Sequence, residues 1–215
     1  MLPRAILISI ALLSVVPAVL AAGPIVPGPG LAATATQASR QIYIEALGGV
    51  SLPGKLEFFH PAPNGVGELE VGAAFAGVVG LATGIDGLAA EFDVFYTGRD
   101  YTMLPPNLDG TTTMTTIMGD LKYTVDLTDT FSLYGAAGIG VLRLQDSDST
   151  GPFTDGWKTG YVLKVGAATA IANDLSLVGE VRYMDSFEYF EAISPTDDRS
   201  HAATSAALIG LRFGL

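Results

Sequence analysis

Apolar and polar positions alternate along most of the chain after residue 40. In 68–79, Leu69 and Phe75 belong to an apolar set of alternate positions, while the set between them is acidic or small and includes Glu68 and Glu70. Successive side chains of a β-strand point to opposite faces, so this period of two predicts a strand with one apolar and one polar face.

The same alternation recurs often enough to predict an eight-stranded sheet. The predicted strands cover 41–50, 68–79, 88–99, 117–125, 131–143, 161–171, 175–183 and 203–213. A strand of about ten residues, tilted by about 45°, spans the hydrocarbon of a bilayer. In 131–143 both sets of positions are apolar or small, so the pattern does not assign the side of Arg143.

The connections between these segments alternate in length. Three short ones fall at 83–87, 127–130 and 172–174, and four long ones, rich in Pro, Gly, Asp, Ser or Thr, fall near 51–67, 100–112, 144–158 and 186–202. In an up-and-down meander the short turns gather at one end and the long loops at the other. Outer-membrane barrels have this asymmetry, with short periplasmic turns and long extracellular loops.

The charged set of positions must face the barrel interior, because a basic side chain on the lipid side costs about 2–4 kcal/mol at mid-depth. The interior of an eight-stranded barrel is just wide enough for side chains to fill, which favours an ion-paired plug over a wide pore. Acids exceed bases there, so any channel would prefer cations. The predicted interior charge network is Glu45, Glu70, Glu91, Asp93, Asp120, Lys122, Lys164, Glu180, Arg182 and Arg212.

Aromatic residues gather at both ends of the predicted strands, as the girdles of a membrane barrel require. The turn end carries Tyr43, Tyr123, Phe131 and Phe213, and the other end carries Tyr96, Tyr101, Trp157, Tyr161, Tyr183 and Phe187.

Residues 1–22 have the three-part layout of a secretory signal peptide, with Arg4, an uncharged run and small residues at Ala21 and Ala22, the expected cleavage positions. A membrane anchor is disfavoured, because the run contains Pro17 and is shorter than the about 20 residues of a spanning helix. Residues 23–40 alternate helix breakers with small residues and predict a periplasmic linker, with a regulatory or peptidoglycan-contacting tail as the alternative. The barrel domain is expected over 41–215.

Composition narrows the function further. The formal charge of -11 and the scattered Lys and Arg exclude a nucleic-acid partner, since phosphate binding needs a basic face. The absence of Cys excludes disulfides and thiolate metal sites. Two His residues, His60 and His201, leave little for metal or acid–base chemistry, so no catalytic, cofactor or metal site is predicted.

The Gly-rich strand around 134–140 and the final strand 207–213 carry a family resemblance. Together with the signal peptide and the meander, they resemble the small Gram-negative outer-membrane β-barrel proteins, which include the OmpA-like barrel domain and porin-family surface proteins. The resemblance implies an outer-membrane location, contact with lipid and lipopolysaccharide, and recognition by the barrel-assembly machinery. The expected assembly signal is Ile209, Leu211 and Phe213 of the last strand.

An enzyme is not expected. By residue type, His201 could form a catalytic triad with Ser200 or Ser205 and Glu180. The His-x-Ser-Asn pattern of barrel lipid A deacylases is absent, however. Acids of the long connections could attract calcium, but a solvated surface is the simpler interpretation. These acids are Asp146, Asp148, Asp155, Asp197 and Asp198.

The sequence therefore predicts an all-β, eight-stranded antiparallel transmembrane barrel with a structural or surface-interaction role through four long extracellular loops. The surface ligand stays open. The alternatives are a narrow, cation-preferring channel or small-molecule conduit, a lipid A-modifying barrel, and a soluble lipocalin-like barrel, which would place the apolar face inside.

Overall fold

The computed structural model describes residues 42–59, 65–103, 108–148, 151–191 and 199–215, all of which belong to one unit of the chain, 35–215. The expected signal peptide (1–22), the expected linker (23–40), His60, Asp197 and Asp198 lie outside the described residues. No helix in the described ranges is long and apolar enough to cross a membrane.

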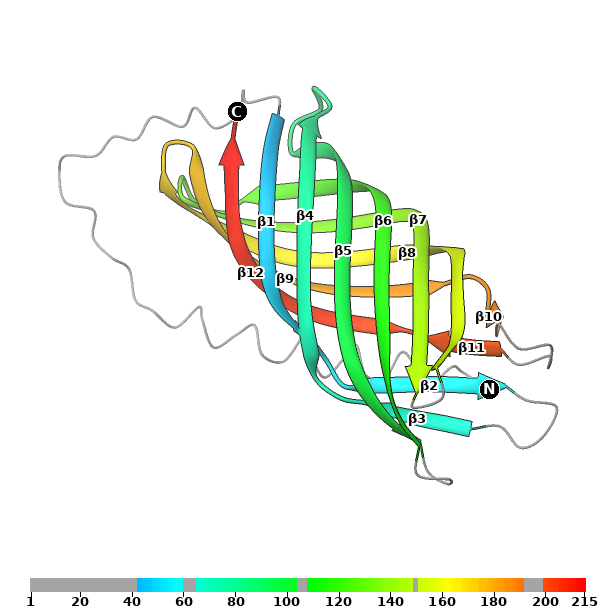
Figure 1. The fold of residues 1–215 in the computed structure, drawn as a ribbon. Helices are drawn as coiled ribbons and strands as arrows, with labels where there is room; N and C mark the ends of the chain where they lie inside the picture. The colour runs from blue at the N-terminus through cyan, green and yellow to red at the C-terminus, as the bar shows by residue number, and fades with distance from the viewer. Residues whose placement is uncertain (1–41, 60–64, 104–107, 149–150, 192–198) are drawn as a thin grey trace, which may run out of the picture. The chain divides into compact units, whose positions relative to one another are not determined.

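Eight long antiparallel strands form a closed barrel (Figure 1). Around the barrel the strands follow the order β1, β4, β5, β6, β7, β8, β9 and β12, and the pairing of β12 with β1 closes the ring. Each long strand therefore has two neighbours. The predicted eight-stranded antiparallel barrel is therefore confirmed. Its strands are β1 (Ile42–Ser51), β4 (Gly72–Ala82), β5 (Leu88–Met103), β6 (Leu108–Asp126), β7 (Phe131–Asp148), β8 (Gly151–Ala172), β9 (Leu175–Ser186) and β12 (Thr204–Gly214).

Three short connections lie at one end, hereafter the turn end. In the β4–β5 turn, Gly84 and Gly87 have φ of 84° and 74°, a backbone region that favours glycine. In the β6–β7 turn, the Thr128 hydroxyl accepts hydrogen bonds from the backbone N–H groups of Thr130 and Phe131. Such side-chain bonds fix tight turns, which explains why these connections are short.

The predicted long loops are wrong in large part, because β-structure continues through them. β5 and β6 remain paired as far as Met103 and Leu108, and β7 and β8 as far as Asp148 and Gly151. Thr-rich sequence at 111–116 suits a strand, although it resembles loop composition. Four short strands complete this end: β2 (Gly54–Phe59), β3 (Gly65–Leu69), β10 (Phe190–Glu191) and β11 (Arg199–Ala202).

We call this part of the wall the extension. It comprises the short strands β2, β3, β10 and β11, together with the ends of four long strands: 99–103 of β5, 108–112 of β6, 143–148 of β7 and 151–157 of β8. Figure 1 shows β2, β3, β10 and β11 at the end of the barrel opposite the short turns.

The outer face of the barrel below the extension is apolar. Phe75, Phe92, Leu121, Ile139 and Val165 are all exposed there. A contiguous apolar band of this kind belongs in lipid, whereas the alternate positions are buried inside. The soluble lipocalin-like alternative places its apolar face inside and does not fit this arrangement.

One predicted face is reversed where β3 meets β4. Glu70 and Val71 are consecutive and both exposed, so the side-chain alternation shifts by one residue between the two strands. Leu69 therefore points inward, with 2% exposure, while Glu68 and Glu70 are exposed. The prediction that Glu70 faces the interior is wrong, since the shift buries a leucine and leaves the carboxylates in water.

Candidate functional site: the interior charge network

Charged side chains from six strands meet inside the half of the barrel nearer the turn end. Glu45 of β1 accepts hydrogen bonds from Lys122 Nζ of β6 at 2.9 Å and from Arg212 Nε of β12 at 2.7 Å. Lys122 also forms an ion pair with Glu91 of β5. Strands that lie on different sides of the barrel are thus joined across its axis.

A second centre of the network surrounds Lys164 of β8. Its Nζ lies 2.7 Å from Asp93 Oδ2 and 3.4 Å from Glu91 Oε2, and it also forms an ion pair with Asp120. Three carboxylates therefore share one ammonium group, whose side chain is fully buried. Pairing of this kind is what allows charges to persist away from water.

Arg182 of β9 joins this centre to the rest of the network. Its guanidinium lies 3.0 Å from Asp93 Oδ1 and 2.6 Å from Glu180 Oε1. The guanidinium also lies 5.1 Å from the centre of the Phe95 ring, a cation–π distance.

Two tyrosines extend the network, and the sequence analysis missed both. Tyr43 donates a hydrogen bond to Glu91 at 2.7 Å, and Tyr134 of β7 donates one to Glu180 at 2.9 Å. The Lys122 ammonium lies 4.4 Å and 5.0 Å from the centres of their rings. Tyr43 shares its strand face with Glu45, so the alternation contained the signal, and its assignment to the girdle is wrong.

The small inward side chains of β4 leave room for these groups. Ala74, Ala76 and Val78 are buried, and a Cβ at Gly80 would meet the Tyr43 ring. At Gly138 of β7 a Cβ would likewise meet Asp120 Oδ1. The narrow interior therefore needs small residues beside its large polar ones, and Gly80 and Gly138 are the cross-strand neighbours of Tyr43 and Asp120.

The structure thus brings together nine of the ten residues assigned to the network, and Glu70 is the exception. Five carboxylates pair with four cations. The carboxylates are Glu45, Glu91, Asp93, Asp120 and Glu180, and the cations are Lys122, Lys164, Arg182 and Arg212. We call these nine residues, with Tyr43 and Tyr134, the charge network.

An apolar layer follows the charge network along each strand toward the extension. Phe95 succeeds Asp93 on β5, Met118 precedes Asp120 on β6, and Met184 succeeds Arg182 on β9, all buried. Leu142, Met114 and Val162 belong to the same buried cluster. The barrel is therefore filled by side chains on both levels.

A further polar group lies beyond this layer, inside the extension. Arg99 donates hydrogen bonds to Thr204 Oγ1 at 2.8 Å and to the Leu52 carbonyl at 3.4 Å. Asp146 is 1% exposed, so it is a buried residue and not the surface loop acid expected from the sequence. Burial raises the pKa of Asp146 to about 6, against the hydroxyls of Thr112, Thr154 and Ser200 and the charge of Arg99.

His201 and its neighbours do not form a catalytic triad. Its Nε2 lies 2.8 Å from Asp185 Oδ1 on the outer side of the wall, and this hydrogen bond raises the pKa of His201. Ser200 is buried inside the barrel, because adjacent residues of β11 point to opposite faces. Glu180 belongs to the charge network, bound to Arg182 and Tyr134.

No group of three or more His, Asp or Glu side chains in the described ranges is arranged to hold a metal ion. Of the acids considered for calcium, Asp155 is bound to Arg143, whose Nε and Nη2 donate hydrogen bonds of 2.8 Å to its two oxygens. These bonds lower the pKa of Asp155. Arg143 itself lies on the outer face of the barrel, because its neighbours Leu142 and Leu144 on β7 both point inward.

The outward face also carries the expected assembly residues and most of the girdle. Ile209 and Phe213 of β12 are exposed and Leu211 is half-buried, all on the outer face. Tyr96, Tyr123, Trp157 and Phe187 are exposed as well. Tyr101, however, is buried inside the extension, so its assignment to the girdle is wrong.

Comparison with known proteins agrees with this architecture. The family described as outer membrane protein beta-barrel domain matches residues 8–213. The structure is similar to OprG of Pseudomonas aeruginosa, with 12% identity and a TM-score of 0.62, over 82% of this chain and 96% of that chain. It is also similar to Neisserial surface protein A, with 16% identity and a TM-score of 0.51, over 81% and 97%.

The outer membrane protease OmpT of Escherichia coli is a third similar structure, with 9% identity and a TM-score of 0.50, over 81% of this chain and 97% of that chain. At these identities the likenesses show the fold alone. No curated protein matches the chain.

Proposed function

Because this chain belongs to the outer membrane protein beta-barrel domain family and lies in the outer membrane, we propose that it is a structural and surface-interaction protein that binds partners through its extension. The short turns then face the periplasm and the extension faces the medium, as in other barrels of this kind. The observation that carries the proposal is the filled interior, which directs function to the outer surface.

The burial of the charge network supports this reasoning. Lys164, Arg182 and Asp120 have fully buried side chains, and each is held by an ion pair that crosses the interior. Opening a passage would break buried pairs, and loss of one partner of such a pair costs about 3–5 kcal/mol. A permanent wide pore is therefore disfavoured.

The extension has an acidic surface, which indicates the chemistry of its partner. Its exposed carboxylates are Glu57, Glu68, Asp100, Asp109, Asp155 and Glu191, with Glu70 and Glu188 in the adjoining connections, whereas its exposed basic side chains within the described ranges are Lys55, Arg143 and Arg199, of which Arg143 is paired with Asp155. Complementary charge speeds encounter and selects partners. We therefore expect a cationic ligand, such as a lysine-rich peptide segment.

The test measures binding of a fluorescent lysine-rich peptide to the protein in nanodiscs of zwitterionic lipid. The variant Glu57→Gln/Glu68→Gln/Glu70→Gln should weaken binding roughly tenfold at low salt, given about 0.2–1 kcal/mol for each exposed pair. The control Asp86→Asn/Asp126→Asn/Asp129→Asn changes the net charge equally at the turn end, where these residues are exposed.

Equal weakening in the two variants would mean that net charge alone attracts the peptide and would overturn the proposed role of the extension. So would wild-type binding that is no tighter than that of empty nanodiscs. Both variants should keep the faster migration of the unboiled protein on a gel, which shows that the barrel is folded.

The assembly machinery of the outer membrane is the proposed partner during biogenesis. The outward set Ile209, Leu211 and Phe213 on the last strand supports this, because these side chains are free of the barrel interior. Phe213→Ser should slow assembly of the folded form in cells, while Phe75→Ser, at an exposed position of β4, should not.

A second candidate function is a narrow, cation-preferring conduit, favoured by one observation. The charge network contains five carboxylates and four basic groups, and an excess of acid favours cations in a pore. Single-channel recordings of the refolded protein in planar bilayers test this. Current steps with a cation preference would support the conduit over a purely surface role, and a trace without steps would exclude it.

A further inference from the structure

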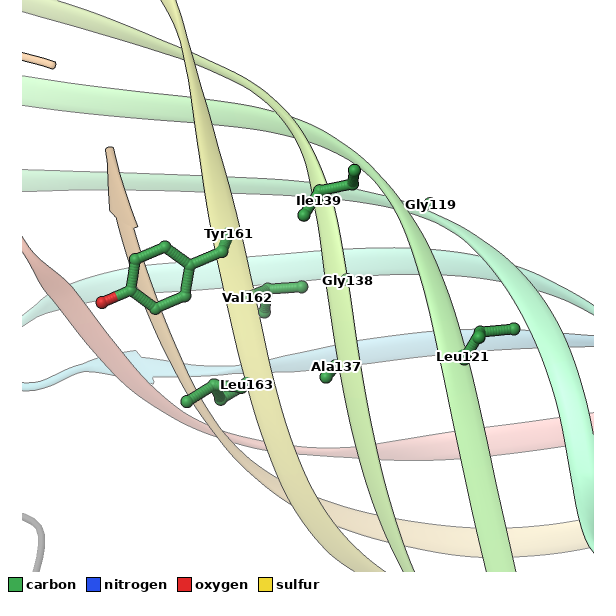
Figure 2. A pocket seen from close by; sticks show the side chains of 8 residues that line it. All are labelled: Gly119, Leu121, Ala137, Gly138, Ile139, Tyr161, Val162 and Leu163. Carbon is green, nitrogen blue, oxygen red and sulfur yellow. The ribbon is translucent and has the colours of Figure 1, made fainter. Parts of the chain in front are cut away.

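A shallow apolar groove of about 380 Å³ lies on the lipid-facing side of β6, β7 and β8 (Figure 2). Two adjacent rungs of the sheet form it: Gly119–Ile139–Tyr161 and Leu121–Ala137–Leu163. Gly119 and Ala137 occupy diagonal positions, so the small residues form a depression between four larger side chains. Figure 2 shows the side chains of Leu121, Ile139, Tyr161 and Leu163 around it.

The groove extends from the middle of the apolar face toward the extension. Gly119 and Ala137 are near the middle of the apolar stretches of β6 and β7, and Tyr161 is at the far end of the stretch on β8, toward Trp157. With the short turns in the periplasm, as proposed above, the side of the groove nearer the extension lies in the outer leaflet.

A basic side chain stands at the end of the groove nearer the extension. Along the outer face of β7, Ile139 is followed by Val141 and then Arg143, about 13 Å beyond Ile139 at the rise of a β-strand. Arg143 is the first charged outward residue on that strand and lies opposite Trp157 of β8. Its bonds to Asp155 use Nε and Nη2, which leaves Nη1 to donate to another anion.

From this arrangement we propose that the groove binds one acyl chain of lipid A, with a lipid A phosphate on Arg143. The apolar groove matches the chain, and the guanidinium matches the phosphate at the depth where a headgroup begins. Asp155 holds the guanidinium in place by its bidentate bond. This inference rests on the outer-membrane location and on the orientation given under the proposed function, and not on the proposed binding of cationic partners.

The chain offers its own reporter for the test, because Trp157 is its single tryptophan. The protein is placed in vesicles of phosphatidylcholine that is brominated near the headgroup, which quenches Trp157, and lipid A is titrated in. Displacement of the quencher restores the fluorescence. In the wild type, recovery should occur at roughly one-tenth of the lipid fraction expected for random exchange, since a hydrogen bond to a charged group contributes about 1.5–3 kcal/mol.

Groove-filling variants separate this site from general lipid contact. Gly119→Leu should remove most of the preference for lipid A, and a Cβ there meets nothing nearer than the Ile139 carbonyl at 4.0 Å, so folding should persist. Gly77→Leu on β4 is the matched control, because it is also an exposed outward glycine with open space around it. It should leave the titration unchanged.

Headgroup variants test the charge. Arg143→Gln should reduce the preference for lipid A to that for dephosphorylated lipid A, while Arg199→Gln, an exposed change within the extension, should have no effect.

Four outcomes would overturn the proposal. The first is recovery that follows random exchange in the wild type, and the second is an equal loss in Gly119→Leu and Gly77→Leu. The third is recovery by phosphatidylglycerol at the same fraction as lipid A, which would assign the site to anionic phospholipid. Fluorescence that depends on protein concentration and not on lipid A would indicate a second copy of the chain in the groove, and would also overturn it.

Discussion

The two halves of the barrel interior bury polar groups in different ways. In the charge network every basic residue has at least one carboxylate partner, such as Lys164 with Asp93 at 2.7 Å. In the extension, Asp146 is surrounded mainly by hydroxyls, and Arg99 is bonded to Thr204 and a carbonyl. Ion pairing therefore preserves charge in the first half, whereas burial in the second half raises the pKa of a carboxyl to about 6.

The largest expected effect comes from the charge network. Lys164→Met should destabilise the barrel by about 3–5 kcal/mol, because it leaves Glu91, Asp93 and Asp120 without the ammonium that they share. Urea titration of the protein in lipid vesicles measures this loss. Lys55→Met, at an exposed position of β2, is the control and should change little.

Adding Asp120→Asn to Lys164→Met should restore part of the lost stability, since it removes one of the uncompensated charges. If Lys164→Met unfolds at the wild-type urea concentration, the network does not stabilise the barrel and the contrast between the two halves fails.

Asp146 is expected to give the next largest effect, and it depends on pH. Its folded pKa is about 6 against an ordinary value of 3.8, so the folded chain binds this proton more tightly than the unfolded chain. Stability from this group is present below about pH 4 and falls by roughly 3 kcal/mol as pH rises through 6, at about 1.4 kcal/mol for each pH unit.

Asp146→Asn should remove this slope and be more stable than the wild type at pH 8. Urea titrations at pH 4, 6 and 8 measure both quantities, with Asp155→Asn as a control that retains the slope. An identical slope in Asp146→Asn and the wild type would show that the extension does not bury this carboxyl.

His201 should have a smaller effect of the opposite sign. Its pKa is raised by the hydrogen bond to Asp185, with a further contribution from Glu57, so its stabilisation is present below pH 6.5 and is lost as pH rises through the folded pKa. His201→Gln should lose under about 1 kcal/mol at pH 5.5, as for other partly exposed pairs, and nothing at pH 9. NMR titration of the imidazole checks the direction, and a folded pKa below 6.5 would contradict it.

The smallest effect is expected at the outer rim. Arg143 and Asp155 are bonded to each other, but both side chains are 36% exposed, and water replaces either partner at little cost. Asp155→Asn should therefore leave the free energy of unfolding unchanged in the urea titration. A loss as large as that of His201→Gln would place this pair among the structural ones.

Several features of the fold and the site were predictable from the alternation alone. Eight charged residues lie on the inner face, as the cost of charge in lipid requires. They are Glu91, Asp93, Asp120, Lys122, Lys164, Glu180, Arg182 and Arg212. Tyr134 was out of reach, because both sets of positions in 131–143 are apolar or small and do not distinguish the two faces. The alternation is local, and it sets the face of each side chain wherever a strand runs without interruption.

Other features depended on where strands bend and how far their pairing continues. Glu70 is exposed because the side-chain alternation shifts by one residue between β3 and β4, and no residue type at that point indicates the shift. The strand pairing at 100–112 and 144–158 also escaped prediction, since its Thr, Ser and Asp residues resemble a loop. Strand pairing is a contact between distant segments, so composition alone does not fix its length.

The sequence by itself determined the strand count, the charged interior and the apolar outer face, because each follows from alternation and from the cost of placing charge in lipid. Only the tertiary structure decided which carboxylate meets which base. It also decided that Arg143 faces outward above a groove and that Asp146 is buried in the extension. Those outcomes depend on the register between strands, which closes the barrel and sets side chains from opposite walls within reach of one another.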